Sequence, residues 1–349
     1  PDMPIAARRV FRLSLTMALA LAGAYGLALP LPFLAPLFAL VLGAAPAPPP
    51  GPKGLLGLIL LVVITLGVGV LLIPMLLNYA LTGILLVAVG LYFSTYLTIH
   101  RGKALIGTFL TIGFTLISAA GTLDYSLAVT VIKALVLGIA VAIVCQWVVY
   151  PWFPEDQAGA RARTAAAPDA LQSNWIALRA ALIVLPAYLL ALTNPAAYLA
   201  IIMKSVSLAQ QGSAVSARDA GRELLGSTLL GGCFASLFWL ALKLQPNLWM
   251  FFLWMLLFGV YFAAKMFGVF ASRFPASFWL NVGVTMLILL GPAVEDSANG
   301  KDVYQAFVVR MGLFVAVTLY AWLAVYLLEQ LRTRRRTSRL TACALPPGG

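Results

Sequence analysis

Long uncharged apolar runs are the feature of this sequence that most restricts its fold. Residues 54–99 contain no Asp, Glu, Lys or Arg, and similar runs cover residues 13–52, 134–154, 180–203 and 274–294. A helix of about 20 apolar residues crosses a hydrocarbon core of about 30 Å. With 62% hydrophobic and only 10% charged residues among 349, the composition also departs from that of soluble domains. The sequence therefore predicts an all-α integral membrane protein.

Breaks in these runs at Pro, Gly, Asn and charged clusters divide the chain into about twelve transmembrane helices. The expected segments are residues 11–29, 31–45, 54–74, 76–96, 103–120, 126–150, 176–193, 195–208, 221–243, 247–268, 275–293 and 303–329. The second and the eighth are short and are bracketed by Pro-containing breaks at residues 29–33 and 193–195. Short segments of this kind are typical of half-helices or re-entrant pieces beside a solute path.

Basic residues are distributed unevenly between alternate loops. If both termini are cytoplasmic, nearly all Lys and Arg residues, Lys204 among them, fall on the cytoplasmic side, and only Lys243 and Lys301 fall outside. This is the asymmetry that the positive-inside rule describes. Membrane topology thus explains most of the formal charge of +12. The excess of basic over acidic residues therefore does not indicate nucleic-acid binding. We expect a multi-pass protein of the bacterial inner membrane with both termini in the cytoplasm.

Matching motifs occur in the two halves of the chain. Lys-Gly-Leu-Leu-Gly at residues 53–57 aligns with Arg-Glu-Leu-Leu-Gly at 222–226, and Ile-Gly-Phe-Thr at 112–115 aligns with Val-Gly-Val-Thr at 282–285. Two six-helix repeats keep the same orientation and share a pseudo-two-fold axis along the membrane normal, near which a solute path would lie. The expected units are a first six-helix repeat (1–156), a cytoplasmic linker (157–173), a second six-helix repeat (174–331) and a basic cytoplasmic tail (332–349).

Lys133 and Arg310 are each a cation inside the last helix of a predicted repeat. A cation at mid-membrane costs about 2.5–3.5 kcal/mol. On one interpretation both residues face a water-filled path and bind an anion there. On the other, each extends to the outer interface or pairs with the acid that precedes it, Asp124 or Asp302.

Asp124 and Asp302 begin the sixth and twelfth predicted helices. An N-terminal carboxylate is favoured by the helix dipole, so capping is one role. Coupling transport to protons is the other, since few further acids lie near the membrane. Beside the short segments, Phe33, Asn194, Tyr198 and Lys204 are candidates for solute binding, because broken helices leave backbone groups free. The alternative there is an ordinary Pro-rich turn with interfacial side chains.

The sequence lacks the motifs of several other classes of protein. It has one His, three dispersed Cys and no Gly-Lys-Ser/Thr loop that would bind a nucleotide phosphate. An enzyme acting on lipid would need clustered acids or His at one interface, and no such cluster is present. We expect no cofactor, no metal and no enzymatic activity.

The motif Arg-Glu-Leu-Leu-Gly-Ser-Thr-Leu-Leu-Gly at residues 222–231, with Ala-Leu-Arg-Ala-Ala-Leu at 177–182, resembles a region of the fusaric acid resistance and aromatic acid exporter family. The chain is similar to a short branch of that family, because its linker is too short for the large cytoplasmic domain of many relatives. The six-helix units also resemble those of plant aluminium-activated malate transporters, which pair around a basic anion path.

The resemblance implies an inner-membrane efflux transporter for small organic anions such as aromatic carboxylates. It also implies a proton-driven cycle, a periplasmic membrane-fusion protein and an outer-membrane channel as partners. Two alternatives remain open from the sequence, namely a passive organic-anion channel and a non-transporting scaffold of an efflux assembly. No residue spacing demands a homo-oligomer.

Overall fold

The computed structural model describes residues 3–156 and 168–344, and within them all regular structure is helical. The α-helices are α1 (Ile5–Gly26), α2 (Leu34–Gly43), α3 (Pro52–Asn78), α4 (Ala80–His100), α5 (Ala104–Ile112), α6 (Ser118–Leu123), α7 (Tyr125–Val149), α8 (Ala170–Thr193), α9 (Pro195–Ala214), α10 (Ala220–Leu244), α11 (Leu248–Met266), α12 (Ala276–Ala298) and α13 (Val303–Ala344). A π-helical turn, η1 (Gly113–Ile117), joins α5 to α6, and a 3-10 turn, η2 (Tyr150–Trp152), follows α7.

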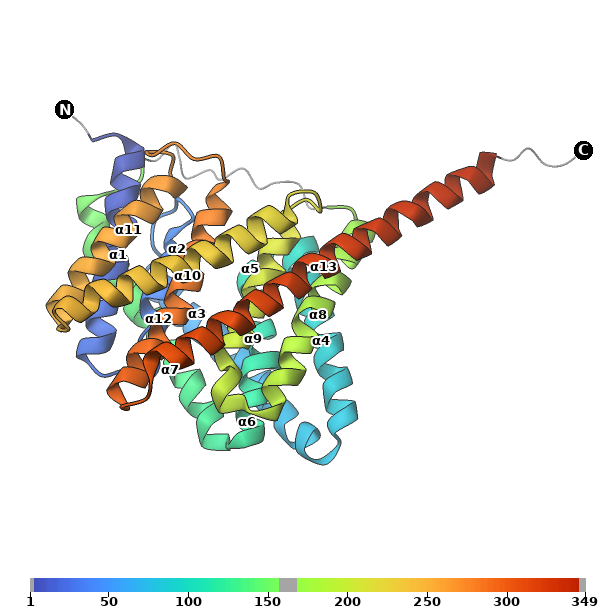
Figure 1. The fold of residues 1–349 in the computed structure, drawn as a ribbon, viewed down its shortest axis with the longest axis horizontal. Helices are drawn as coiled ribbons and strands as arrows, with labels where there is room; N and C mark the ends of the chain where they lie inside the picture. The colour runs from blue at the N-terminus through green and yellow to red at the C-terminus, as the bar shows by residue number, and fades with distance from the viewer. Residues whose placement is uncertain (1–2, 157–167, 345–349) are drawn as a thin grey trace, which may run out of the picture.

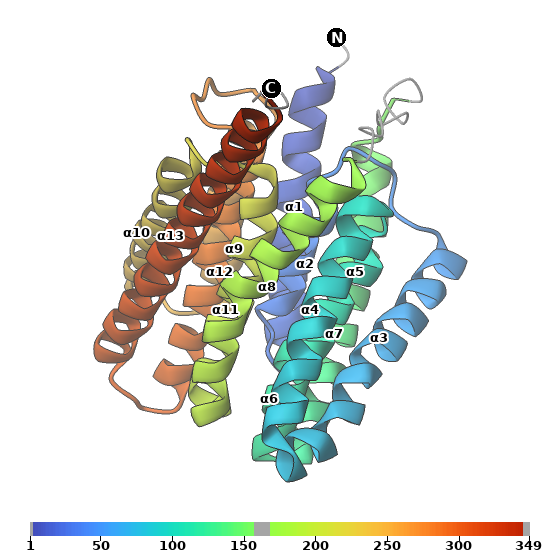
Figure 2. The ribbon, with the colours of Figure 1, turned by 90° about the vertical axis from the view of Figure 1, so that its right-hand side faces the viewer.

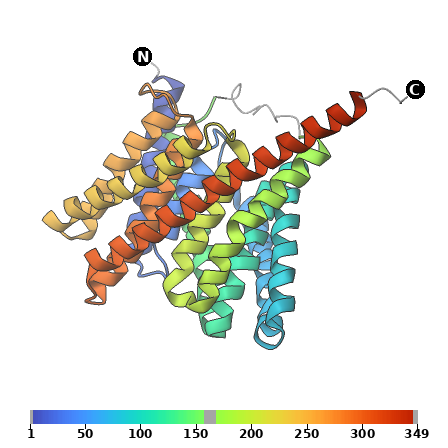
Figure 3. The same ribbon diagram turned by 45° about the vertical axis from the view of Figure 1, so that its right-hand side comes forward.

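The helices form one bundle in which α1 begins and α13 ends at the same end (Figures 1 and 2). We call this end the terminal side and the opposite end the far side. Successive segments alternate in direction, so the connections after α2, α4, α9 and α11 lie on the terminal side (Figure 2). The last turns of α13 project beyond the bundle (Figure 3).

Nine helical segments within residues 3–156 and 168–344 are long and apolar enough to cross a membrane. They are Pro52–Asn78, Ala80–His100, Ala104–Leu123, Tyr125–Trp152, Ala170–Thr193, Ala220–Leu244, Leu248–Met266, Ala276–Ala298 and Val303–Ser338. Their length matches the hydrocarbon core of a bilayer. The fold is therefore that of an all-α, multi-pass membrane protein, as the apolar runs predicted.

Each of the twelve predicted segments corresponds to a helical segment, with differences in detail. The second is short as expected, because α2 has 10 residues, but the eighth is the 20-residue helix α9. The prediction ended it at residue 208 because polar residues follow. Gln211 is buried, however, and the polar stretch up to Ala214 belongs to the helix. The predicted linker overlaps the start of α8, and its residues 157–167 lie outside the described part of the chain.

Close helix contacts depend on glycine at particular positions. A Cβ atom at Gly69 in α3 would lie 1.9 Å from the carbonyl oxygen of Gly113 in η1, and one at Gly113 would lie 2.6 Å from the carbonyl oxygen of Thr65. Small residues let membrane helices approach to backbone contact, where dispersion and weak hydrogen bonds stabilise the pair. These glycines therefore fix α3 against the π-helical turn.

Two helix pairs join the first part of the chain to the second. α1 packs along α11, and α4 packs along α8. Further contacts also join the two parts of the chain: α2 contacts α12, and α9 contacts η1 and α6. The centre of the bundle is thus formed by α2, η1, α9 and α12, two from each half of the chain.

Candidate solute path

Two cavities lie along the central helices, one toward each side of the bundle. The far-side cavity has a volume of about 580 Å³ and is lined mainly by α9, α12, α13 and the start of α2. The terminal-side cavity, of about 270 Å³, is lined by α2, α5, α9 and α12. Leu34, Leu116 and Met203 line both. We call these three residues the apolar constriction, because they lie where the two cavities adjoin.

The far-side cavity contains charges of both signs. Its charged lining residues are Glu295, Asp296, Lys301, Asp302 and Arg310. Arg310 Nη2 donates to Asp296 Oδ2 at 3.2 Å, and the two side chains are only 16% and 13% exposed. Arg310 Nη1 is buried and has no hydrogen-bond partner among the described residues. The guanidinium therefore has one donor group without a partner, shielded from solvent in the wall of a cavity large enough for a small organic molecule.

The terminal-side cavity has a different character. Among the described residues, its lining combines apolar side chains with uncharged polar ones on α5, α9 and α12. Ser207 Oγ donates to Asn281 Oδ1 at 2.9 Å, and Gln210 Nε2 donates to Thr108 Oγ1 at 3.1 Å. Such a surface can contact a ring on its apolar wall and hydrogen-bond a polar substituent.

Four of the predicted site residues meet in the far-side cavity: Phe33, Tyr198, Asp302 and Arg310. The sequence predicted Arg310 and Lys133 as a pair, but the structure does not bring them together. Lys133 is exposed on α7 and lines neither cavity, although Val131, two residues earlier, lines the far-side one. Asn194 is also exposed and lies outside both cavities, where its carbonyl oxygen accepts from the amides of Ala197 and Tyr198.

Lys204 occupies a place that the sequence did not indicate. Its side chain is fully buried in the middle of α9, and its Nζ donates to Thr285 Oγ1 of α12 at 2.8 Å. It lines neither cavity. Its assignment to the cytoplasmic loops was therefore wrong, because the polar residues around it continue the helix.

Asp124 and Asp302 both cap helices. Asp124 accepts from the amide and the hydroxyl of Ser126 at the start of α7, and Asp302 Oδ1 accepts from the amides of Tyr304 and Gln305. The hydrogen bonds from Ser126 hold the pKa of Asp124 below its usual value. A proton carrier near neutral pH needs a raised carboxyl pKa, so the geometry of Asp124 favours capping.

Two acids at the end of α12 were not among the predicted site residues, although one of them, Asp296, pairs with Arg310. Glu295 and Asp296 end α12, one turn from the loop that leads to α13. The signal available was their position, since they are two acids at the end of a membrane helix that is followed directly by the helix carrying Arg310. An intramembrane cation indicates that an acid lies on a neighbouring helix end.

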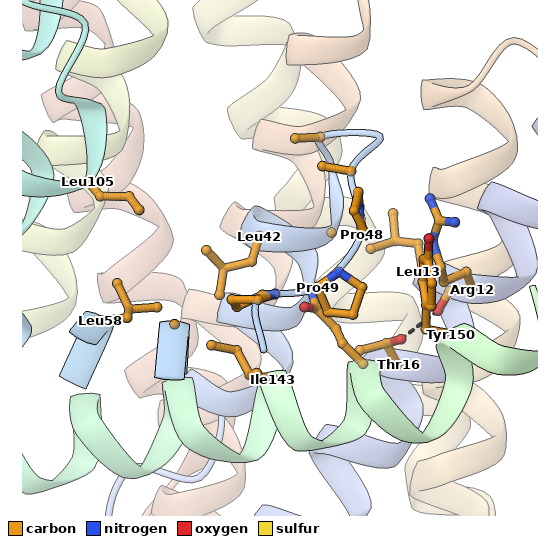
Figure 4. A pocket seen from close by; sticks show the side chains of 16 residues that line it. Arg12, Leu13, Thr16, Leu42, Pro48, Pro49, Leu58, Leu105, Ile143 and Tyr150 are labelled. Atoms are coloured by element: carbon orange, nitrogen blue, oxygen red, sulfur yellow. Dashed lines mark hydrogen bonds between the residues drawn. The ribbon is translucent and has the colours of Figure 1, made fainter. Parts of the chain in front are cut away.

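A third cavity, of about 340 Å³, lies on the terminal side under the Pro-rich connection between α2 and α3 (Figure 4). It shares no lining residue with the other two cavities. At its edge Arg12 Nη2 donates to Glu155 Oε2 at 2.7 Å, and Arg9 also pairs with Glu155. These ion pairs fasten the start of α1 to the chain that follows α7. We assign them a structural role.

The fold and the cavities define a multi-pass α-helical membrane protein with a charged cavity on one side of its central helices. Residues 9–149 match the model of a family described as "Protein of unknown function (DUF2955)". The matched region begins inside α1 and ends at the last residue of α7. No curated protein and no solved structure matches the chain.

Proposed function

We propose that this chain transports small organic anions across the membrane, with Arg310 as the group that binds the anion. The observation that carries the proposal is the free, buried Nη1 of Arg310 beside the far-side cavity. A guanidinium inside a membrane bundle is costly, and such residues mark ion and substrate paths. Its planar donors match the oxygens of a carboxylate.

The path runs between α2, η1, α9 and α12. The far-side cavity supplies a site for the charge, and the terminal-side cavity supplies apolar and uncharged polar walls for the rest of the solute. An aromatic carboxylate has both parts. This substrate class also follows from the resemblance to aromatic acid exporters carried by residues 177–182 and 222–231.

A duplicated architecture supports the proposal, because two equal halves would place a path between them. In the first half α1 packs on α2, and α2 on α7; in the second α8 packs on α9, and α9 on α13. Arg12 of α1 pairs with Glu155 after α7, and Arg179 of α8 lies 4.0 Å from Glu329 of α13. We propose two parallel six-helix repeats on this basis, and the family match over residues 9–149 spans the first of them.

We further propose that the terminal side is cytoplasmic and that the membrane is a bacterial inner membrane. The charges at the starts of α1 and α3 and along the end of α13 are basic, as the positive-inside rule requires of a cytoplasmic face. Efflux would then run toward the far side. Proton coupling, a membrane-fusion partner and an outer-membrane channel remain predictions from the family resemblance.

A passive anion channel is the second candidate. The apolar constriction favours a carrier, because Leu34, Leu116 and Met203 separate the two cavities that a channel would join by a continuous wet pore. Saturation of flux by solute, with no single-channel current, would distinguish the carrier from the channel. A scaffold would show no flux without partners.

The test is uptake of radiolabelled benzoate into proteoliposomes that contain wild type, Arg310→Gln or Lys133→Gln. Each variant removes one cation from a membrane helix, but only Arg310 lines a cavity. We expect wild type to show saturable uptake. Arg310→Gln should reduce this uptake at least about tenfold, because one charge-assisted contact to the anion is lost. Lys133→Gln should retain wild-type uptake. Equal effects of the two substitutions, or the absence of uptake for carboxylates in general, would contradict the proposal.

A further inference from the structure

We infer that Asp296 is an internal counter-ion that competes with the transported anion for Arg310 and so sets how tightly the anion is held and how fast it leaves. The inference rests on the proposed function and names the residue that controls the same site. Its basis is the geometry of Asp296 and Arg310 at the wall of the far-side cavity.

The state without solute requires a counter-ion for Arg310. A buried cation without a partner carries a large desolvation cost, and removing one member of a buried pair leaves that cost uncompensated. Asp296 supplies the missing charge through the 3.2 Å hydrogen bond to Nη2. The empty protein is thereby stabilised with its anion-binding group already neutralised.

The same pair leaves room for a solute. Asp296 engages Nη2, whereas Nη1 of the same guanidinium is buried without a partner. A carboxylate in the cavity can replace Asp296 at Nη2, and a rotation of the guanidinium that brings the unpaired Nη1 to the cavity would complete a two-point contact. Return of Asp296 to Nη2 reverses the exchange and releases the solute, so Arg310 is never left without an anion.

The other charged and titratable groups of the cavity do not occupy this position. Glu295 and Lys301 line the same cavity and are exposed, with no ion pair to Arg310. Asp302 is engaged in capping α13, and Tyr198 lines the cavity from α9. The residues of α2, η1 and α7 that line the cavity carry no charge. Asp296 is therefore the acid that is placed to compete with the solute.

Glu295 provides a matched control because it is adjacent to Asp296 and faces the same cavity. Asp296→Asn and Glu295→Gln remove one negative charge each, but only the first removes a hydrogen-bond partner of Arg310. A general electrostatic effect would be similar for the two, whereas competition is specific to Asp296. Asp296→Glu keeps the carboxylate and should behave like wild type, whereas tighter anion binding by Asp296→Asn is a result that a merely structural role for Asp296 does not predict.

The experiment measures benzoate binding to purified protein by isothermal titration and benzoate uptake into proteoliposomes, for wild type, the three variants and Arg310→Gln. Asp296→Asn should bind benzoate about tenfold more tightly, as expected when a competing charge pair is removed. Its half-saturating benzoate concentration and its maximal uptake rate should both fall, because release becomes slower. Glu295→Gln should change binding by less than about twofold.

The outcomes separate this inference from the proposed function. If Arg310→Gln abolishes binding but Asp296→Asn binds as wild type or more weakly, Arg310 is the anion site and the competitor role is wrong. If wild type does not bind benzoate, both the function and the inference are contradicted. Asp296→Ser makes the same comparison if Asp296→Asn does not elute as a single folded species.

Discussion

Asp296 Oδ2 accepts a hydrogen bond from Arg310 Nη2 at 3.2 Å, across the turn that joins α12 to α13. The pair explains how a guanidinium is tolerated within the membrane bundle, since its charge is neutralised from the adjacent helix end. Among residues 3–156 and 168–344 no acid forms an ion pair with Lys133, which is exposed on α7. The two cations that the sequence paired therefore differ in environment, and only Arg310 faces a cavity.

The contact of α3 with η1 predicts different effects for two nearby glycine substitutions. Gly69→Ala would put a Cβ 1.9 Å from the carbonyl oxygen of Gly113, whereas Gly67→Ala would meet no atom within 4 Å. We expect Gly69→Ala to destabilise the protein by about 2 kcal/mol or more, because backbone must move. Gly67→Ala should be neutral or slightly stabilising. Thermal unfolding in detergent, followed by circular dichroism, measures both, and equal midpoints would rule out this tight contact.

The buried Lys204 predicts an unusual pattern of stability. Thr285→Val removes the hydrogen-bond acceptor of the fully buried Lys204 amino group and should cost about 1–3 kcal/mol. Lys204→Met removes the buried polar group itself and should be neutral or stabilising, and it should offset Thr285→Val in the double variant, since both partners are then apolar. Because Lys204 lines neither cavity, benzoate binding should survive Lys204→Met. Loss of binding with an unchanged unfolding midpoint would instead assign Lys204 to the site.

Glu155 predicts a dependence of stability on pH. Burial of its side chain, 2% exposed, opposes ionisation, but the hydrogen bonds and charges of Arg9 and Arg12 outweigh it, so the pKa of Glu155 is lowered. A lowered folded-state pKa stabilises the fold above the unfolded-state pKa, and this contribution is lost as the pH falls through the folded-state pKa. Glu155→Gln should therefore lower the unfolding midpoint at pH 7. The difference from wild type should shrink only below about pH 4.5, near the ordinary Glu value, and a difference that is constant down to pH 3 would contradict this.

The helix pattern was predictable because it depends on composition that is local in the sequence. An uncharged apolar run longer than about 20 residues is long enough to cross a membrane, and its backbone groups are hydrogen-bonded within the segment only in a helix. The positions of α3, α4 and α12 therefore follow from the lengths of such runs. The extent of α9 did not follow, since Gln211, beyond the predicted end at residue 208, indicates a loop until its partner Ser227 is known. Ser227 is on the next helix, α10, so this pairing depends on how α9 and α10 pack.

The candidate site was predictable in part for the same reason. Arg310 was found because a cation inside an apolar helix is anomalous wherever its side chain points. Lys133 shows the same anomaly, but the direction of a side chain on a helix depends on packing of neighbouring helices. The acid that pairs with Arg310 and the cavities beside it arise from the approach of α9, α12 and α13, which no local pattern records.

The most direct measurement tests whether solute passes through the apolar constriction. Cys145, Cys233 and Cys343 would be replaced by Ser, and Met203→Cys would be compared with Leu244→Cys, which is 82% exposed at the far end of α10 and lines neither cavity. Benzoate uptake is measured before and after a methanethiosulfonate reagent, with the extent of labelling followed by mass spectrometry. The proposed path predicts that labelled Met203→Cys loses uptake, that benzoate slows its labelling, and that labelled Leu244→Cys keeps uptake. Full labelling of Met203→Cys with undiminished uptake would contradict a path between α2, η1, α9 and α12.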